Sequence, residues 1–188
     1  MLIIYAHPNK TGHCGEILSQ LQRQLEACDT EHELLDLYEM GFDPVMHQNE
    51  HYTSGGHDIT ETNRVIQEKF KQHDRFVFIY PTWWNNVPAI LKGFIDKIFT
   101  NHFAFEYRHK IPVGLLKGKT AIITTTGAAR PFGKILMKDR SITLLKTDAL
   151  KFCGIKSKGF IVGSATELSG KQKKKIQKTV SSAIHYLK

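Results

Sequence analysis

Cysteine is scarce in this sequence, and paired metal-ligand motifs are missing. The three cysteines, Cys14, Cys28 and Cys153, are an odd number at wide spacing. A disulfide framework needs an even number, and a structural zinc site needs thiolates or histidines in close pairs. The histidines are scattered without an acidic or thiolate cluster beside them. We therefore expect reduced thiols and no bound metal.

Long hydrophobic runs are also absent. The opening segment MLIIYAHP is apolar only as far as His7, which is too short for the ~7 to 15 apolar residues of a secretory signal. Residues 87–99 form a more apolar segment, but they include three charged side chains, and a membrane span needs ~18 apolar residues. We expect a cytoplasmic chain without membrane insertion. Its 188 residues predict one domain over residues 1–188.

Acidic residues are outnumbered by basic ones, which gives a formal charge of +8 and an isoelectric point of about 9.4. Much of the excess lies in GKQKKKIQK, residues 170–178, where apolar side chains mark one helix face and the lysines lie largely on the other. No aromatic residue is interleaved with these lysines to stack on bases. A solvated helix face is therefore favoured, and we expect no nucleic-acid partner.

Apolar runs typical of buried strands alternate with helical patterns along the chain. The expected strands are residues 2–6, 34–37, 75–80, 119–126 and 158–163. The expected helices lie near residues 17–28, 61–73, 87–99, 138–153 and from Ser169 onward, while residues 38–60 lack periodicity. This alternation predicts an α/β doubly wound parallel sheet with helices on both faces. Ligands of such sheets bind beyond the carboxyl ends of the strands, so three loops are candidates.

The first loop follows residue 6 and reads His7-Pro8-Asn9-Lys10-Thr11-Gly12-His13-Cys14-Gly15. It offers a hydroxyl, imidazoles and unhindered backbone N–H groups at the start of a helix, and these groups suit a phosphate. The loop matches neither of the common glycine-rich phosphate motifs. Taken alone, it fits an ordinary polar connection equally well.

The second loop, residues 81–88, holds both tryptophans of the chain between a strand and an amphipathic helix. Flat aromatic side chains and free backbone amides can hold the ring of a flavin. Packing of one tryptophan beneath the loop is the alternative. The third loop, residues 124–131, has small side chains whose backbone N–H groups could stabilise negative charge on a reduced flavin, with Arg130 as the nearest cation for a nicotinamide phosphate.

Six segments in the same order carry a family resemblance: IIYAHP at residues 3–8, DLYEMGFDPV at 36–45, YPTWWNNVPAILKGFIDKIF at 80–99, FAFEY at 103–107, TTG at 125–127 and KFCGI at 151–155. With them the chain resembles the flavodoxin-like NAD(P)H quinone oxidoreductases, the family of DT-diaphorase, modulator of drug activity B and the ancillary proteins of potassium efflux systems. The resemblance implies a flavodoxin-like fold with five parallel strands in the order 2-1-3-4-5.

The resemblance also implies the site residues. It assigns His7, Thr11, His13 and Cys14 to the flavin phosphate, Pro81, Thr82, Trp83, Trp84 and Asn85 to the ring, and Thr125, Thr126 and Gly127 to its pyrimidine edge. Some relatives carry a Tyr and a His shortly after the third loop that assist charge relay, whereas this chain has Phe132 and no histidine there. Water, Tyr107 or His109 are then the candidates for proton delivery. Tyr107 fits a dimer contact equally well.

The implied reaction is a ping-pong transfer of two electrons from NAD(P)H to a quinone or similar aromatic acceptor. FMN is the expected cofactor, with FAD as the alternative. The resemblance further implies a homodimer in which residues 102–107 are a candidate contact. A flavin-binding regulatory partner of a membrane transporter is the alternative function. A one-electron carrier is disfavoured because such carriers are usually acidic.

Overall fold

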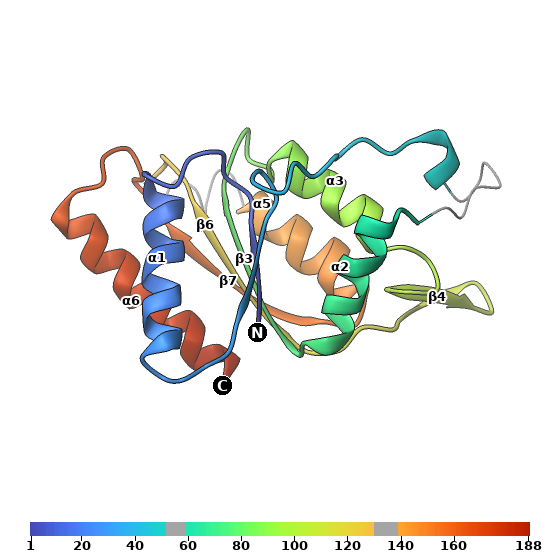
Figure 1. Ribbon diagram of the computed structural model, residues 1–188. Coiled ribbons are helices and arrows are strands. Elements are labelled where there is room, and N and C mark those ends of the chain that lie inside the picture. Colours follow the sequence, from blue (N-terminus) through green and yellow to red (C-terminus); the bar gives the residue numbers. More distant parts are fainter. Residues whose placement is uncertain (52–58, 130–138) are drawn as a thin grey trace.

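Five parallel strands form the central sheet in the part of the chain that the computed structural model describes, residues 1–51, 59–129 and 139–188. They are β1 (Leu2–Tyr5), β2 (Glu33–Asp36), β3 (Arg75–Pro81), β6 (Lys119–Thr125) and β7 (Lys156–Val162). Their order across the sheet is β2-β1-β3-β6-β7 (Figure 1). Counted along the chain, this is the predicted flavodoxin-like order 2-1-3-4-5.

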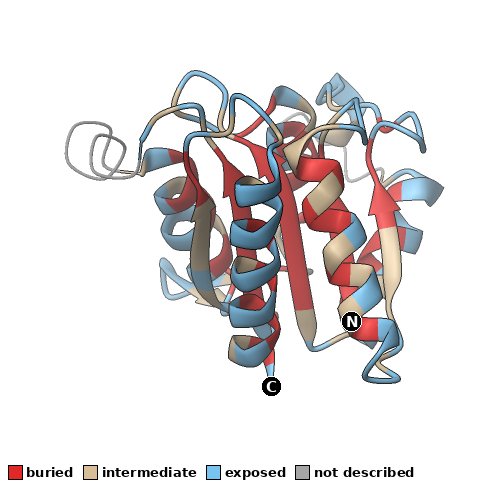
Figure 2. Ribbon diagram, turned by 90° about the vertical axis from the view of Figure 1, so that its left-hand side faces the viewer, coloured by how far each residue is buried: buried red, intermediate tan, exposed pale blue. Residues whose placement is uncertain are grey.

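The strands in the middle of the sheet are buried on both faces. Every residue of β1 is fully buried, and so are Val77 and Phe78 of β3 and Ile122 and Ile123 of β6. Runs rich in isoleucine and valine suit this position because β-branched side chains pack well on a pleated surface. Figure 2 shows these strands as a red layer between helices whose outer faces are exposed.

Helices cover both faces, as the alternating pattern predicted. One face carries α1 (His13–Glu26) and α6 (Gly170–Leu187), and the other carries α2 (Glu61–Gln72), α3 (Ala89–Ile98), α5 (Arg140–Thr143) and the π-helical segment η3 (Leu144–Lys151) (Figure 1). The α6 helix begins after Ser169, whose hydroxyl accepts a hydrogen bond from the backbone N–H of Gln172 at 3.4 Å. The predicted helix over 138–153 is divided between α5 and η3, and residue 138 lies outside the described residues.

A hairpin of β4 (Phe105–Arg108) and β5 (Ile111–Gly114) was missed in the sequence. Its two turn residues, His109 and Lys110, have positive φ angles of 51° and 67°. Such turns usually carry Asn or Gly, which accept this conformation at low cost. Because neither residue is present, the usual hairpin signal is absent from the sequence.

The irregular segment after β2 is fastened to α3 by a buried cation. Lys97 of α3 has a side chain only 4% exposed, and its Nζ lies 3.0 Å from a carboxylate oxygen of Glu50 and 3.3 Å from one of Asp43. Glu50 ends the short 3-10 helix η1 (Gln48–Glu50). At Gly93 a Cβ atom would lie 2.1 Å from the carbonyl oxygen of Pro44, so α3 and this segment are in direct backbone contact.

Within the described ranges no helix is both long and apolar enough to cross a membrane. The same residues contain no cluster of three or more His, Cys, Asp and Glu side chains that could hold a metal ion. All three cysteines are free; Cys14 and Cys153 are buried, and Cys28 is exposed.

Candidate functional site

The three candidate loops meet at the carboxyl edge of the sheet. The first and second loops meet where the rings of His7 and Trp83 lie 6.0 Å apart between centroids. The second and third loops are joined by a hydrogen bond of 2.7 Å from the backbone N–H of Thr82 to the carbonyl of Thr125. The side chain of Cys14, in the first turn of α1, lies 3.4 Å from the hydroxyl of Thr125. One ligand can therefore contact all three loops.

The first loop is held in shape by its own hydrogen bonds. The Asn9 side-chain oxygen accepts from both the backbone N–H and the hydroxyl of Thr11 at 2.7 Å. The backbone N–H of Asn9 donates to Nδ1 of His7 at 3.0 Å. Lys10 pairs with Asp36, at the end of β2, at 2.9 Å, and also contacts Glu39. These bonds fix the loop before any ligand binds.

The start of α1 fits a phosphate. No side chain caps this helix, so the first backbone N–H groups point outward without a capping acceptor. The Nε2 atom of His13 is buried and has no hydrogen-bond partner among the described residues. A Cβ atom at Gly12 would meet nothing within 4 Å, which shows open space beside these donors. An anion placed at this helix start would satisfy the N–H groups.

Gly15 explains how close the loop and the helix come. A Cβ atom at this position would lie 1.7 Å from the carbonyl oxygen of Lys10, so the helix can approach the loop only with glycine here. The approach brings the backbone of residues 10–12 against the first turn of α1.

Cys14 supports the site rather than reacting in it. Its side chain is 2% exposed, and burial raises the pKa of the thiol to about 12, although the Thr125 hydroxyl opposes the rise. The thiol therefore stays protonated at neutral pH and is a weak nucleophile. Near the phosphate, Cys14 can contribute its backbone N–H.

The second loop is a tight turn that projects from the sheet. Trp83 and Asn86 exchange backbone hydrogen bonds of 3.1 and 2.9 Å. The two residues between them, Trp84 and Asn85, have positive φ angles of 51° and 57°, as in a type I′ turn. Trp83 is 41% exposed and Trp84 is 98% exposed. The expected alternative, a tryptophan packed beneath the loop, is not observed.

Thr82 and Pro81 brace this turn from below. The Thr82 hydroxyl lies 3.0 Å from that of Thr124 and 2.9 Å from that of Ser141. The Tyr80 hydroxyl donates to the carbonyl of Ser141 at 2.9 Å. Pro81 is buried at the end of β3. Because the N–H and hydroxyl of Thr82 are already engaged, this residue contributes to the site mainly by holding β3, β6 and α5 together.

The third loop is tied to the end of β7. The backbone N–H of Thr126 donates to the carbonyl of Val162 at 3.0 Å, and Ser164 N–H donates to the carbonyl of Ala128 at 3.0 Å. Gly127, between these anchors, is exposed and has open space around its Cα. The backbone N–H of Ala128 donates to the hydroxyl of Thr126 at 3.3 Å, so the open space lies at Gly127 itself. Arg130, the expected cation, lies outside the described residues.

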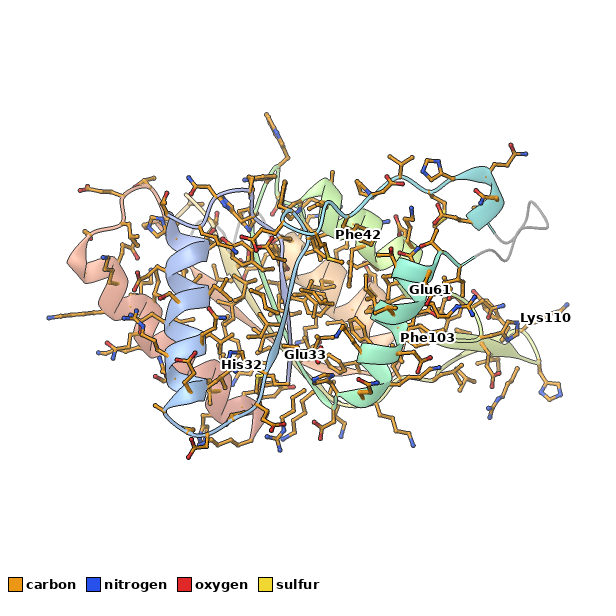
Figure 3. All side chains as sticks on the ribbon, viewed as in Figure 1. His32, Glu33, Phe42, Glu61, Phe103 and Lys110 are labelled. Carbon is orange, nitrogen blue, oxygen red and sulfur yellow. The ribbon has the colours of Figure 1, made fainter. Side chains whose placement is uncertain are left out.

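Tyr107 and His109 are not brought to the three loops within one chain. Both lie on the β4–β5 hairpin, which extends past α2 at the right of Figure 1, whereas the loops lie at the top. Figure 3 shows Lys110, next to His109 at the tip, on the far right of the molecule. Tyr107 is 60% exposed. The assignment of these two residues to proton delivery stays a prediction.

Comparison with known proteins identifies relatives that share this fold or are named as NAD(P)H oxidoreductases. A family model for the flavodoxin-like fold matches residues 1–187. An uncharacterized NAD(P)H oxidoreductase of Haemophilus influenzae is 31% identical over 162 residues, which are 85% of this chain and 80% of that protein. An FMN-dependent NADH:quinone oxidoreductase of Caldicellulosiruptor saccharolyticus is 34% identical over 120 residues, 62% of this chain and 56% of that protein.

A solved structure agrees with these sequence matches. Smu.1420 from Streptococcus mutans superposes with a TM-score of 0.81 at 31% identity and covers 98% of both chains. The family match covers almost the whole sequence, and the sheet order and the converging loops are those that the resemblance implied. The resemblance is therefore confirmed, and the chain belongs to the flavodoxin-like family of NAD(P)H quinone oxidoreductases.

Proposed function

We propose that this protein is an NAD(P)H-dependent flavin oxidoreductase that delivers two electrons at a time to quinones or similar aromatic acceptors. The observation that carries the proposal is the convergence of three loops beside an uncapped helix start, where the His13 Nε2 has no partner among the described residues. The names of its relatives support the same activity, with FMN as cofactor and NAD(P)H as donor. They offer no support for the transporter-partner alternative.

The first loop and α1 would hold the flavin phosphate. The N–H groups of His13 and Cys14 lie in the first turn of a helix without a side-chain cap, and the His13 Nε2 has no partner among the described residues. The positive end of the helix dipole favours an anion there. Thr11 and His7, which are held in the same loop by their bonds to Asn9, would border the phosphate. FAD carries a phosphate in the same part of the molecule, so this loop accepts either flavin.

The other two loops would hold the ring. Trp83 offers an exposed aromatic surface, while Trp84 and Asn85 add the projecting edge of the turn, braced by Pro81 and Thr82. Thr125, Thr126 and Gly127 would border the other edge of the ring, where Gly127 is exposed. When bound, a flavin accepts a hydride from a nicotinamide and passes it to the acceptor. N–H groups near Gly127 would stabilise the negative charge that reduction places on the ring edge.

A homodimer would complete this site. The aromatic wall at Trp84 is almost fully exposed in one chain, and the hairpin with Tyr107 and His109 is exposed and projects away from its own loops. A second copy that places this hairpin against the turn would cover both surfaces. It would also bring a phenol and an imidazole to the acceptor pocket, where either can donate a proton.

The test is to purify the protein, record its absorbance spectrum and identify the released cofactor by mass. We expect a yellow protein that releases FMN and oxidises NADH or NADPH in the presence of a simple quinone. A mass equal to that of FAD would change the cofactor and leave the reaction as proposed. A colourless protein that takes up neither flavin would overturn the proposal.

A further inference from the structure

The outer edge of β7 is a free strand edge among the described residues, because β7 ends the sheet. Its inner edge pairs with β6: Lys156 N–H donates to the Gly118 carbonyl, and Thr126 N–H donates to the Val162 carbonyl. In a parallel ladder alternate residues bond to alternate sides. The backbone groups of Ser157, Gly159 and Ile161 therefore point outward, where a further strand would pair with them.

A groove of about 910 Å³ lies between this edge and the first turns of α6. Phe160 and Ile161 of β7 supply its apolar side. Its charged lining side chains are Lys171, Lys174, Lys175, Lys178 and Glu167. Four cations against one carboxylate give the groove a strongly positive lining. A negatively charged ligand would be attracted to it.

Only some of these lysine side chains form hydrogen bonds within the protein. Lys175 donates to the carbonyl of Gly163 at 2.9 Å, and the side chain of Gln172 donates to the carbonyl of Ser164 at 2.6 Å. These bonds join the first turns of α6 to the segment after β7. The ammonium groups of Lys171, Lys174 and Lys178 have no ion-pair partner among the described residues, and all three side chains are exposed. They can therefore form ion pairs with carboxylates of another molecule.

We propose that this groove binds an extended acidic segment of a partner protein, which adds a strand to the free edge of β7. Such a segment pairs its backbone with Ser157, Gly159 and Ile161 and directs carboxylates toward Lys174 and Lys178. Phosphate groups of a lipid or nucleic acid would meet the lysines but leave the strand edge unpaired. A second copy of this chain is disfavoured, because Lys156 and Lys158 would face the same lysines across the contact.

The test uses the flavin-loaded protein and a fluorescent peptide of about ten residues that alternates Glu with Thr. Fluorescence anisotropy measures its binding. A second peptide has the same sequence with N-methyl groups on alternate residues, which block strand pairing and keep the charge. The variant K174E/K178E reverses two groove charges. The control K146E/K151E makes the same change in net charge at exposed positions of η3, outside the groove.

We expect the unmodified peptide to bind, and both K174E/K178E and N-methylation to weaken binding by at least about tenfold. The control variant should change binding by less than about twofold. If both variants lost the same peptide affinity, net charge alone would explain binding. If the methylated peptide bound as tightly as the unmodified one, binding would not involve an added strand. Either result overturns the proposal. So would binding of phosphatidylglycerol vesicles or polyuridylic acid that is tighter than binding of the peptide. Turnover of NAD(P)H should be unchanged in both variants, so this test is independent of the proposed activity.

Discussion

The loop after β1 and the loop after β3 are both part of the candidate site, but they are built in opposite ways. The first is closed by hydrogen bonds between its own residues and is packed against α1 without room for a methyl group at Gly15. The second is a strained turn whose tip, Trp84, is 98% exposed. The single chain therefore holds the first loop rigid and leaves the second loop open. In the proposed function, the rigid loop binds the phosphate, and substrates and a second copy approach the open one.

The largest effect is expected from breaking the packed loop with Gly15→Ala. The added Cβ would lie 1.7 Å from the carbonyl oxygen of Lys10, so the loop must move away from α1. Overpacking of this kind costs about 1 to 3 kcal/mol of stability. Displacement of the phosphate donors by about 1 Å should weaken FMN binding by about a hundredfold. Urea unfolding and flavin-fluorescence quenching measure the two effects.

The matched control for this change is Gly12→Ala, because a Cβ at Gly12 meets no atom within 4 Å. It should leave the free energy of unfolding within about 0.5 kcal/mol of the original protein. A loss as large as that of Gly15→Ala would show that the loop tolerates no side chain at all, and that close packing at Gly15 is not the cause.

His13→Ala separates ligand binding from stability within the same loop. Its Nε2 has no partner among the described residues, so its loss should hardly change the urea midpoint. A hydrogen bond to a charged phosphate is worth about 1.5 to 3 kcal/mol, so FMN affinity should fall by about tenfold or more. His185→Ala, at an exposed position of α6, is the control. Unchanged FMN affinity would exclude His13 from the phosphate site.

Trp84→Gly tests the open loop, where we expect function and stability to change in opposite directions. Glycine accepts the positive φ of 51° without strain, so the free energy of unfolding should rise by about 1 kcal/mol. Loss of the aromatic wall should lower kcat/KM for quinone by about tenfold. Trp84→Ala removes the same ring but keeps a Cβ, and should lower kcat/KM without the gain in stability. A large loss of stability in both variants would mean that the ring packs against the protein.

The smallest effect concerns the thiols. The pKa of Cys14 is raised to about 12 by burial, so its neutral form persists well above the ordinary pKa of a cysteine, about 8.5. The native protein should therefore react with a thiol reagent at exposed Cys28 and, below about pH 10, hardly at all at Cys14. Peptide mapping after labelling measures this. The unfolded chain releases the Cys14 proton at a lower pH than the folded protein does. The free energy of unfolding should therefore fall as the pH rises from about 8.5 to about 12.

The layout of the sheet could be predicted from the sequence because alternating apolar runs and helical patterns determine it. Ser169 marked the start of α6 correctly, and the helix expected over residues 87–99 is α3, which begins at Ala89. The β4–β5 hairpin could not be predicted, because its turn uses His109 and Lys110 in place of Asn or Gly. The spatial separation of Tyr107 from the loops depends on the direction of that hairpin, which local sequence does not encode.

The candidate site was predictable to a similar extent. Strand ends of a parallel sheet lie at one edge, so the meeting of the three loops followed from their positions in the chain. The exposure of Trp84 did not, because an aromatic residue in a loop can pack inward or outward, and only the backbone φ of the turn decides. The role of Ser141 was also missed, since its contact with Thr82 spans 59 positions in the chain and no motif marks it.

The buried Lys97 has a mechanical consequence. It ties residues 43–50 to α3, and α3 begins at Ala89, directly after the tryptophan turn. Together with the contact between Gly93 and Pro44, this makes the irregular segment and that helix one stiff body. A displacement of residues 43–50 would therefore also move α3 and the turn before it, which carries Trp83 and Trp84.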